Sequence, residues 1–334
     1  AEINPMQYGT IVHYILERFF GEYTKEEYLS LEEDKFQKIV CAYLAEYAVK
    51  YFGEEQLESN SFTYRLKTIL DNVMYLMKHI MEELSQSEFF VADCELKIGE
   101  DIPSYTIVLP DGHKIAVCGS VDRVDIMQRA DITYLRIIDY KTGTKQFKLS
   151  DILYGINLQM LLYLHSIEAS GGDKYGEIVP AGILYMPATV PYIPSDSLKS
   201  IDKLPDELNK KLKMNGLLLK DTEIIHGMDK TDAATYIPVK IKAGEPVSST
   251  SLATLAEFGK IFKKVDMLIA EMGKNIYNGN IEAKPLKGGH DSCEYCPYDS
   301  VCAYRQSNPI TCFSVDNKTV IEEITNEING KEEK

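Results

Sequence analysis

Apolar residues near the start of the chain recur at helical spacing. In residues 5–20 they form one stripe, made of Val12, Ile15, Leu16 and Phe19. A spacing of i, i+3, i+4 and i+7 places such residues on a single helix face. Residues 25–52 and 62–84 continue this period over longer stretches. The pattern therefore predicts a helical N-terminal region.

The next part of the chain changes to shorter apolar runs, which predict strands. They cover residues 89–98, 105–109, 114–127, 132–140 and 178–186. A Pro-Asp-Gly-His turn separates the second run from the third, and their even spacing predicts a meander. A helical pattern over 149–170 precedes the last of these strands. Strands followed by a helix and a further strand indicate an α/β fold.

The last part of the chain has a weaker pattern. Residues 187–249 are rich in Pro, Lys and Asp, and we expect an insertion with short strands such as 235–241. Residues 252–277 have the period of a long helix, and a cysteine-containing loop follows at 285–302. The charged end, 317–334, is expected to be frayed.

Composition limits the class of protein. The chain has 334 residues, 45% of them hydrophobic, which is enough for a large core. It carries 36 Lys plus Arg against 51 Asp plus Glu, a formal charge of −15. This charge argues against a free-standing nucleic-acid binder, for which a basic surface is expected. A local basic groove or a partner protein could still hold a polyanion.

Location and completeness follow from simple features of the sequence. No apolar run approaches the roughly 18 residues that a membrane span needs, and no secretory signal is present. We therefore expect no membrane association. Seven cysteines, three of them clustered, do not resemble an extracellular disulfide framework, so a reducing cytoplasm is expected. The chain starts at Ala1 without an initiator Met, and we expect it to be a piece of a longer protein.

Two carboxylates stand inside apolar strand patterns. Asp122 lies in Gly-Ser-Val-Asp-Arg-Val-Asp, and Asp139 follows Ile137 and Ile138. Burying such groups is costly unless something pairs with them, and hard oxygen ligands suit Mg²⁺. Lys141 lies two residues after Asp139, so both side chains face the same way on a strand. An ammonium there could assist a metal-bound water or stabilise additional negative charge.

Two further observations limit the chemistry. His13 lies just off the apolar stripe of the first helix, and its spacing alone favours a half-buried structural histidine. No GxxxxGK[ST] phosphate loop occurs, so ATP hydrolysis by that route is not expected.

Taken in order, the motifs resemble those of a known family. They are Gly9-x3-His13, Gly119-x2-Asp122-Arg-Val-Asp125, Asp139-Tyr-Lys-Thr-Gly143 and Gln159-x3-Tyr163. This order is similar to the PD-(D/E)XK nuclease superfamily, in the branch of RecB-like and AddB-like helicase–nuclease subunits. The resemblance covers residues 9–302 and is weakest over 187–249. The leading Pro-Asp of the superfamily name is absent here, and the Gly-x-x-Asp strand replaces it.

The resemblance implies a restriction-endonuclease-like α/β core, with a central mixed β-sheet flanked by helices. An N-terminal helical region and a C-terminal cysteine loop add to this core. The expected segments are 1–88 (helical part), 89–186 (catalytic core), 187–249 (insertion), 250–312 (helix and cysteine loop) and 313–334 (charged tail).

The resemblance also implies roles for individual residues, and it makes a metal-ligand role the better interpretation of His13. The implied metal ligands are His13, Asp122, Asp139 and the backbone carbonyl of Tyr140. Lys141 would be the catalytic lysine. Gln159 and Tyr163 would contact DNA or orient the site. Glu95 matches a recurrent acidic position only loosely.

The cysteines form a separate motif, Cys293-x2-Cys296-x5-Cys302. Zinc and iron–sulfur centres usually take four ligands. The resemblance implies a 4Fe-4S cluster whose fourth cysteine lies upstream of residue 9. We therefore expect the cluster in the full-length protein and not in this chain, with the three sulfurs lying close together. The alternative fourth ligands within the chain are Cys41, Cys94, Cys118 and Cys312.

These implications define the expected function. The chain would be the nuclease domain of an AddB-like protein, cutting single-stranded DNA with Mg²⁺ or Mn²⁺ beside an AddA-like helicase partner in double-strand break repair. One alternative is a stand-alone RecB-like iron–sulfur exonuclease of the CRISPR-adaptation type. Another is an inactive nuclease-like DNA-binding or scaffold module, against which the intact Asp122, Asp139 and Lys141 argue.

Overall fold

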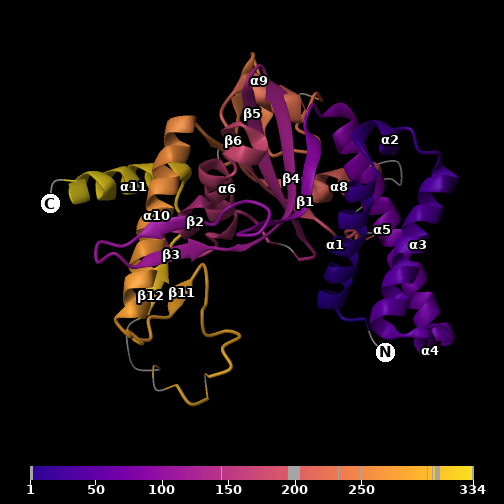
Figure 1. The fold of residues 1–334 in the computed structure, drawn as a ribbon, viewed down its shortest axis with the longest axis horizontal. Coiled ribbons are helices and arrows are strands. Elements are labelled where there is room, and N and C mark those ends of the chain that lie inside the picture. Colours follow the sequence, from indigo (N-terminus) through magenta and orange to yellow (C-terminus); the bar gives the residue numbers. More distant parts are fainter. Residues whose placement is uncertain are drawn as a thin grey trace.

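A mixed six-stranded sheet forms the centre of the computed structural model (Figure 1). The structure describes residues 3–143, 145–194, 204–231, 233–248, 250–298, 300–302, 304 and 309–332. The strands, in spatial order, are β1 (Phe90–Ile98), β4 (Gly119–Arg129), β5 (Ile132–Lys141), β6 (Glu177–Pro187), β7 (Asn215–Leu219) and β10 (Leu252–Ala253). The pairs β5/β6 and β7/β10 are parallel and the others antiparallel. The predicted α/β fold with a central mixed sheet flanked by helices is confirmed.

The N-terminal helices lie together beside β1 (Figure 1). They are α1 (Pro5–Glu22), α2 (Lys25–Leu29), α3 (Glu33–Phe52), α4 (Glu54–Leu57) and α5 (Asn60–Gln86). Asn4 and Gln7 form a capping box that fixes the start of α1, and Pro5 occupies its first turn. The predicted continuous helix over 25–52 is wrong, because Glu32 adopts an extended conformation and starts a new helix.

Four of the later helices are α6 (Gln159–Ser170), α7 (Gly172–Tyr175), α10 (Leu255–Tyr277) and α11 (Asn317–Glu332). The helix predicted over 149–170 is divided into a 3₁₀ turn at Leu149–Tyr154 and α6. Left-handed residues cause this break, with φ of 68° at Gly155 and 54° at Asn157. The prediction that the C-terminal tail is frayed is also wrong. It forms α11, which packs against α10 and buries Val320, Ile324 and Ile328.

The predicted meander is wrong as well. The hairpin of β2 (Tyr105–Val108) and β3 (Lys114–Val117) forms its own two-stranded sheet, and β1 pairs directly with β4. Chain geometry explains the difference: Gly99, with φ of 100°, ends β1 in a turn, and the single strand predicted over 114–127 breaks at Cys118. The β2–β3 hairpin therefore lies outside the central sheet, and the chain rejoins that sheet with β4.

The segment predicted to be an insertion supplies part of the central sheet. It contains α8 (Leu204–Leu212), β7, α9 (Thr222–Met228), β8 (Lys240–Lys242) and β9 (Glu245–Val247). The short strand expected over 235–241 begins only at Lys240. Residues 195–203 of this segment lie outside the described residues. After α10, the parallel pair β11 (Leu286–Gly288) and β12 (Ile310–Cys312) flanks the cysteine loop.

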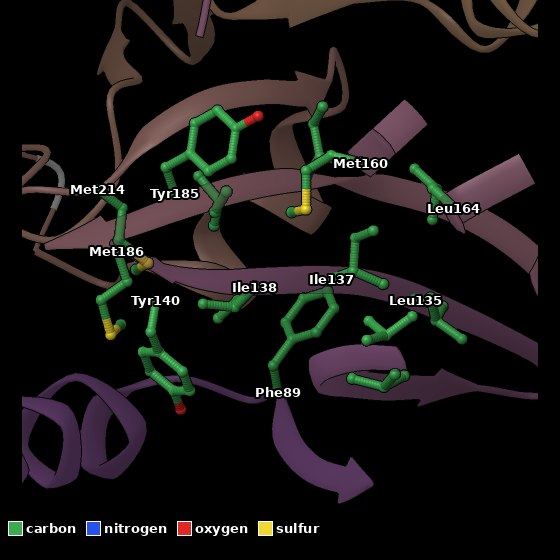
Figure 2. Close-up of a cluster of buried hydrophobic side chains, with 14 of the residues drawn as sticks. Phe89, Leu135, Ile137, Ile138, Tyr140, Met160, Leu164, Tyr185, Met186 and Met214 are labelled. Atoms are coloured by element: carbon green, nitrogen blue, oxygen red, sulfur yellow. The ribbon is translucent and has the colours of Figure 1, made fainter. Parts of the chain in front are cut away.

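Both faces of β5 are covered, which places its C-terminal end deep in the domain. Ile137 and Ile138 are neighbours in sequence, point to opposite faces of the sheet and are both fully buried (Figure 2). Full burial of one such side chain contributes roughly 1.5–3 kcal/mol. Asp139 follows them directly and is only 6% exposed.

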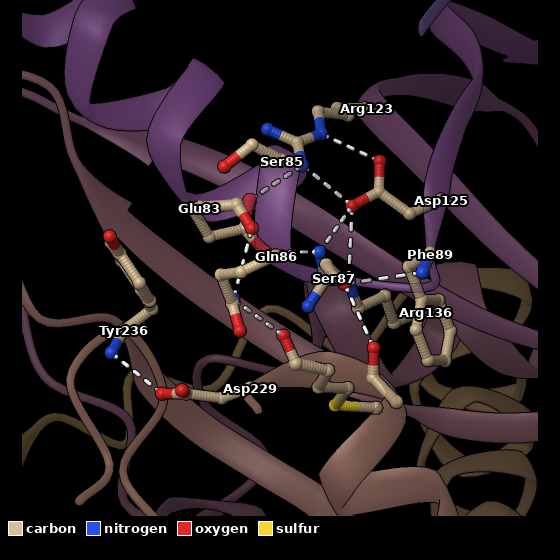
Figure 3. Close-up of polar contacts among 12 residues, drawn as sticks. Glu83, Ser85, Gln86, Ser87, Phe89, Arg123, Asp125, Arg136, Asp229 and Tyr236 are labelled. Atoms are coloured by element: carbon tan, nitrogen blue, oxygen red, sulfur yellow. Dashed lines mark hydrogen bonds and ion pairs between the residues drawn. The ribbon is translucent and has the colours of Figure 1, made fainter. Parts of the chain in front are cut away.

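A buried ionic network attaches α5 to the face of β4 and β5 (Figure 3). Arg123, Asp125, Arg136 and Glu83 all have fully buried side chains. Arg123 Nε donates to Asp125 Oδ1 at 2.6 Å, and Arg136 Nη2 donates to Glu83 Oε1 at 2.6 Å. Two guanidinium groups and two carboxylates balance in charge, which makes burial of the set tolerable. The network therefore fixes β4 immediately after Asp122.

The helices were also expected to lack a membrane span. Among the described residues, no helix combines the length and apolar character that crossing a membrane requires.

Candidate active site

The strand register places three carboxylates on one level of the sheet. β4 and β5 pair Arg123 with Ile138, so the next position along the ladder sets Asp122 opposite Asp139. β1 and β4 pair Cys94 with Arg123, which sets Glu95 opposite Asp122 in the same way. Directly opposed residues of neighbouring strands share a face of the sheet. Glu95, Asp122 and Asp139 therefore form a row across β1, β4 and β5.

His13 of α1 completes a cluster with two of these carboxylates. Its Nδ1 lies 3.3 Å from Glu95 Oε1, and its Nε2 lies 3.7 Å from Asp122 Oδ2. Ligand atoms of these three residues all lie within 4.8 Å of one another, and no other His, Cys, Asp or Glu triple in the described part of the chain does so. Ser120 Oγ donates to Glu95 Oε2 at 2.7 Å and so orients the carboxylate.

Glu95 is the residue of this cluster that sequence reasoning undervalued. Its backbone has a φ of 50°, although it is not glycine and lies within β1. A non-glycine residue in this region costs about 1–3 kcal/mol, and such strain is common at functional sites. An acidic residue inside an apolar strand run was the available signal. The strained backbone could not be inferred from sequence.

The electrostatics of the cluster favour a bound cation. Burial raises the pKa of Asp122 to about 6, and the charge of Asp139 adds to this rise, while His13 opposes it. The hydrogen bond from His13 lowers the pKa of Glu95. Burial alone would lower the pKa of His13, but Glu95 and Asp122 together raise it above the usual value. Carboxylate oxygens with one imidazole make a donor set that fits Mg²⁺ or Mn²⁺.

Asp139 and Lys141 form an ion pair through Asp139 Oδ2 and Lys141 Nζ. They are two residues apart on β5, so they share the side of the strand that the sequence predicted. Lys141 Nζ also lies 5.6 Å from the centre of the Tyr185 ring. The ammonium is therefore held beside the row of carboxylates.

Tyr140 contributes to the site through its backbone. Its N–H donates to Asp122 Oδ2 at 2.9 Å. A backbone hydrogen bond to Tyr140 is also one of the interactions that raise the pKa of His13. The Tyr140 ring is buried and meets the His13 ring edge-on, with 5.6 Å between their centres. The predicted ligand residue is thus adjacent to both His13 and Asp122.

Gln159 and Tyr163 lie on the first turns of α6 and contact each other. Gln159 Nε2 donates to Tyr163 Oη at a long 3.4 Å. Tyr163 packs against Gly119 of β4, where a Cβ atom would stand 2.2 Å from its hydroxyl oxygen. The tyrosine therefore lies beside the strand that carries Asp122.

An open groove gives access to the cluster. Its volume is about 700 Å³, and its lining includes His13, Glu95, Ser120, Thr142 and Tyr51. Gly9 and Thr142 both line the groove and lie close together, since a Cβ atom at residue 9 would stand 3.5 Å from Thr142 Cγ2. The Gly9-x3-His13 and Asp139–Gly143 motifs thus meet at one opening, which leaves room for a chain-like substrate.

The cysteine loop does not present a comparable set of ligands. Cys293 and Cys296 are joined by a turn, and the Cys302 N–H donates to the Tyr298 carbonyl at 2.9 Å. Among the described residues, the sulfurs of Cys293, Cys296 and Cys302 are not all within 4.8 Å of one another, which is the closeness required of ligands of a single metal ion.

The candidate fourth ligands are also accounted for. Cys41 is exposed on α3, Cys94 lies within β1, Cys118 separates β3 from β4, and Cys312 is buried in β12. Within the described ranges, none of them shares with the loop cysteines a set of three or more ligand atoms that all lie within 4.8 Å of one another.

Comparison with known proteins agrees with this geometry. Residues 1–303 match the model of the PD-(D/E)XK nuclease superfamily. The chain is 34% identical over 313 residues to an ATP-dependent helicase/deoxyribonuclease subunit of Thermoanaerobacter sp. (strain X514), covering 90% of this chain and 27% of that protein. It is 32% identical over 335 residues to the protein of the same name from Alkaliphilus oremlandii (strain OhILAs), covering 96% and 29%. A third such protein, from Clostridium kluyveri (strain NBRC 12016), is 36% identical over 278 residues, covering 80% and 24%.

The chain spans less than a third of the length of these curated relatives. The match to the superfamily, by contrast, extends over most of the chain and contains every residue of the His13, Glu95 and Asp122 cluster. The resemblance read from the motifs is therefore confirmed: this chain belongs to the PD-(D/E)XK nuclease superfamily.

Proposed function

We propose that this chain is a metal-dependent deoxyribonuclease domain that hydrolyses phosphodiester bonds of single-stranded DNA. The observation that carries the proposal is the convergence of His13, Glu95 and Asp122 from α1, β1 and β4 beside the Asp139–Lys141 pair. Mg²⁺ or Mn²⁺ would be held by His13, Glu95 and Asp122, with Asp139 and the Tyr140 carbonyl as the remaining candidate ligands. Such an ion, when bound, polarises a phosphoryl oxygen and activates water.

The surrounding groups would orient the metal ligands and stabilise the charge that develops on the phosphate. Asp122 is oriented by the Tyr140 N–H and Glu95 by Ser120, so the oxygens are fixed before substrate arrives. Lys141, held by Asp139, places a positive charge where negative charge develops on the phosphate during attack. The open groove would admit the strand, and Gln159 and Tyr163 of α6, beside Gly119 of β4, are candidate DNA contacts or orienting residues.

The biological setting is proposed from the relatives. Their name describes one subunit of a helicase/deoxyribonuclease, which implies at least one further subunit. We infer that this domain is the nuclease part of such a protein and acts with an AddA-like helicase–nuclease partner in double-strand break repair. Unwinding by the assembly would supply single strands to a domain whose net charge is unfavourable for capturing DNA alone.

An iron–sulfur cluster is a separate proposal, confined to the longer protein. There, Cys293, Cys296 and Cys302 would be joined by a fourth cysteine from outside this chain. Chemical analysis of the anaerobically prepared longer protein should find iron and sulfide. Zinc without iron would contradict this assignment.

Cleavage of a labelled single-stranded oligonucleotide tests the nuclease proposal. We expect cutting with Mg²⁺ or Mn²⁺, weak cutting with Ca²⁺, and none in excess chelator, because the looser coordination of Ca²⁺ does not fix the water well. The matched variants are Asp139→Ala at the site and Asp131→Asn on the exposed turn between β4 and β5. Equal cutting by both variants, or undiminished cutting in chelator, would refute the proposal.

A further inference from the structure

We propose that Lys145 forms a second phosphate-binding position beside the active site, which holds a phosphate of the DNA strand next to the one that is cut. The proposal rests on the nuclease function proposed above and adds a substrate contact that the nuclease motifs do not include. Tyr185 and Asn215 position Lys145 for this contact.

The row of functional side chains continues beyond Asp139. Asp139 pairs with Tyr185 in the β5/β6 ladder, and Tyr185 pairs with Asn215 in the β6/β7 ladder. Asp139, Tyr185 and Asn215 therefore stand on one level of the sheet. A strand of DNA that follows this level would pass from the metal cluster over Tyr185 toward β7.

Asn215 anchors the loop that carries Lys145. Its Oδ1 accepts the Phe147 N–H at 2.7 Å, and its Nδ2 donates to the Lys145 carbonyl at 3.4 Å. Asn215 is the first residue of β7, so the loop after β5 is attached to the sheet itself. The position of Lys145 therefore does not depend on the loop alone.

Two ammonium groups share the Tyr185 ring. Lys141 Nζ lies 5.6 Å and Lys145 Nζ 5.2 Å from the ring centre, and Tyr185 is only 3% exposed. An aromatic ring attracts a cation placed over its face and so holds it in a defined position. Tyr185 thereby brings a second lysine to the side of Asp139 that faces away from His13.

The two lysines differ in how their charge is compensated. Lys141 is paired with Asp139, whereas in the part of the chain that the structure describes Lys145 has no carboxylate oxygen within 4.0 Å. Burial lowers the pKa of Lys145 and the neighbouring Lys141 lowers it further, while the charges of Asp139 and Asp151 only partly oppose this. An anion placed at this point would relieve the repulsion between the two ammonium groups.

A backbone phosphate is the anion that this position fits. The metal ligands on one side of Asp139 are acidic, and the Lys145 ammonium lies on the other side. Lysine binds phosphate as a point charge without reading the base, so the contact would position the strand and not select sequence. The expected energetic effect is on binding shared by the ground state and the transition state.

Salt-dependent binding provides the test, because it needs no cleavage. The full chain, in chelator, is titrated with a single-stranded oligonucleotide at stepped salt concentrations. Removing one phosphate contact should reduce the slope of log K against log salt by about 0.7. We expect this change for Lys145→Ala. The control Lys148→Ala removes an exposed lysine three residues further along the same loop and should leave the slope unchanged.

A second measurement locates the contact. Oligonucleotides with one neutral methylphosphonate linkage, moved stepwise along the strand, are cut by the parent and by Lys145→Ala. One neutral position next to the scissile phosphate should raise the KM of the parent several-fold, but should have no further effect in Lys145→Ala. Lys145→Arg should keep most of the parent's sensitivity.

The outcomes separate this inference from the proposed function. An unchanged salt slope in Lys145→Ala, or equal losses in Lys145→Ala and Lys148→Ala, would overturn the assignment of Lys145 even in an active nuclease. Methylphosphonate effects that are the same in the parent and in Lys145→Ala would also overturn it. A parent chain that cuts no DNA would instead refute the proposed function.

Discussion

The backbone N–H of Tyr140 donates a 2.9 Å hydrogen bond to the carboxylate of Asp122. The donor belongs to β5 and the acceptor to β4, so the bond joins the two strands through the side chain of a proposed metal ligand. Asp122 is mostly buried, and its raised pKa shows that the charged form needs compensation. The Tyr140 N–H and the neighbouring His13 hold this carboxylate in position to bind a cation. The geometry of the proposed metal site is thus set by the sheet.

Loss of Asp139 or Lys141 should abolish most cleavage. Asp139→Ala removes the partner of Lys141 and a carboxylate next to Asp122, and Lys141→Ala removes the ammonium beside the phosphate. Each should lower the rate at least roughly a hundredfold, the scale expected for one key electrostatic group. Rates are measured with Mg²⁺ on single-stranded DNA, and circular dichroism checks folding. Near-parent cutting by a folded Asp139→Ala would contradict the site assignment.

Glu95→Gln should weaken metal binding more than it affects folding. The substitution keeps the shape of the side chain and removes one charge from the His13–Glu95–Asp122 cluster. A calorimetric titration with Mn²⁺ should show a lower affinity for the Glu95→Gln variant than for the parent. Glu17→Gln is the control, because Glu17 lines the same groove outside the cluster. Equal Mn²⁺ affinities of the parent and Glu95→Gln would remove Glu95 from the proposed ligand set.

The contrast between Asp122 and Glu95 shows what sequence could predict of the site. The sequence proposes Asp122, Asp139 and Lys141 as site residues because each lies in a strand pattern at a recognisable spacing, and a carboxylate there requires a partner. Glu95 received little weight because its surroundings match the family loosely. Its position depends on the β1/β4 register and on a left-handed backbone, and neither can be read from a local pattern.

The fold shows a similar limit. Short apolar runs predicted most strands correctly, but such a run does not say which strands pair, so the prediction that β2 and β3 belong to the central sheet is wrong. Helix α11 was missed because charged residues hide its apolar stripe of Val320, Ile324 and Ile328. That stripe stabilises α11 only when it packs against α10, and such a tertiary contact cannot be inferred from composition.

Stability should fall between about pH 6.5 and pH 9 because of His165 on α6. Burial disfavours its charged form, but hydrogen bonds and charges from Asp266 and Glu168 raise its pKa to about 9. A histidine whose pKa is raised by folding contributes stability that is full below its unfolded pKa and is lost as pH rises through the folded value. A shift of this size corresponds to at most about 3 kcal/mol.

Denaturant unfolding at stepped pH measures this effect. His165→Gln should flatten the pH dependence of the unfolding free energy relative to the parent over this range. His113→Gln is the control, because His113 is about half exposed at the β2–β3 turn. An identical pH profile for the parent and His165→Gln would show that the His165 cluster does not contribute as described.

Glu83→Ala should strongly destabilise the domain. Glu83 is the α5 member of the buried network, and its removal leaves Arg123 and Arg136 with one carboxylate between them. Breaking a buried pair by removing one partner typically costs about 3–5 kcal/mol. Chemical denaturation measures the loss. Glu82→Ala, on the exposed side of the same helix turn, should change stability by less than about 0.5 kcal/mol.

Gly119→Ala should lower nuclease activity by displacing Tyr163. A Cβ atom at residue 119 would stand 2.2 Å from the Tyr163 hydroxyl oxygen and 2.7 Å from Cζ of its ring, so the side chain must move. The displaced hydroxyl would also leave its contact with Gln159. If Tyr163 orients the strand, Tyr163→Ala should impair cleavage about as much as Gly119→Ala.

The double variant distinguishes this mechanism from a general effect on β4. Residues that act through one contact are not additive, so Gly119→Ala should cost little more in a Tyr163→Ala background. Cleavage rates of the two single variants and the double variant measure the coupling, with thermal unfolding to confirm that all three fold. Fully additive losses would mean that alanine at position 119 disturbs the strand carrying Asp122 directly, and Tyr163 would then have no orienting role.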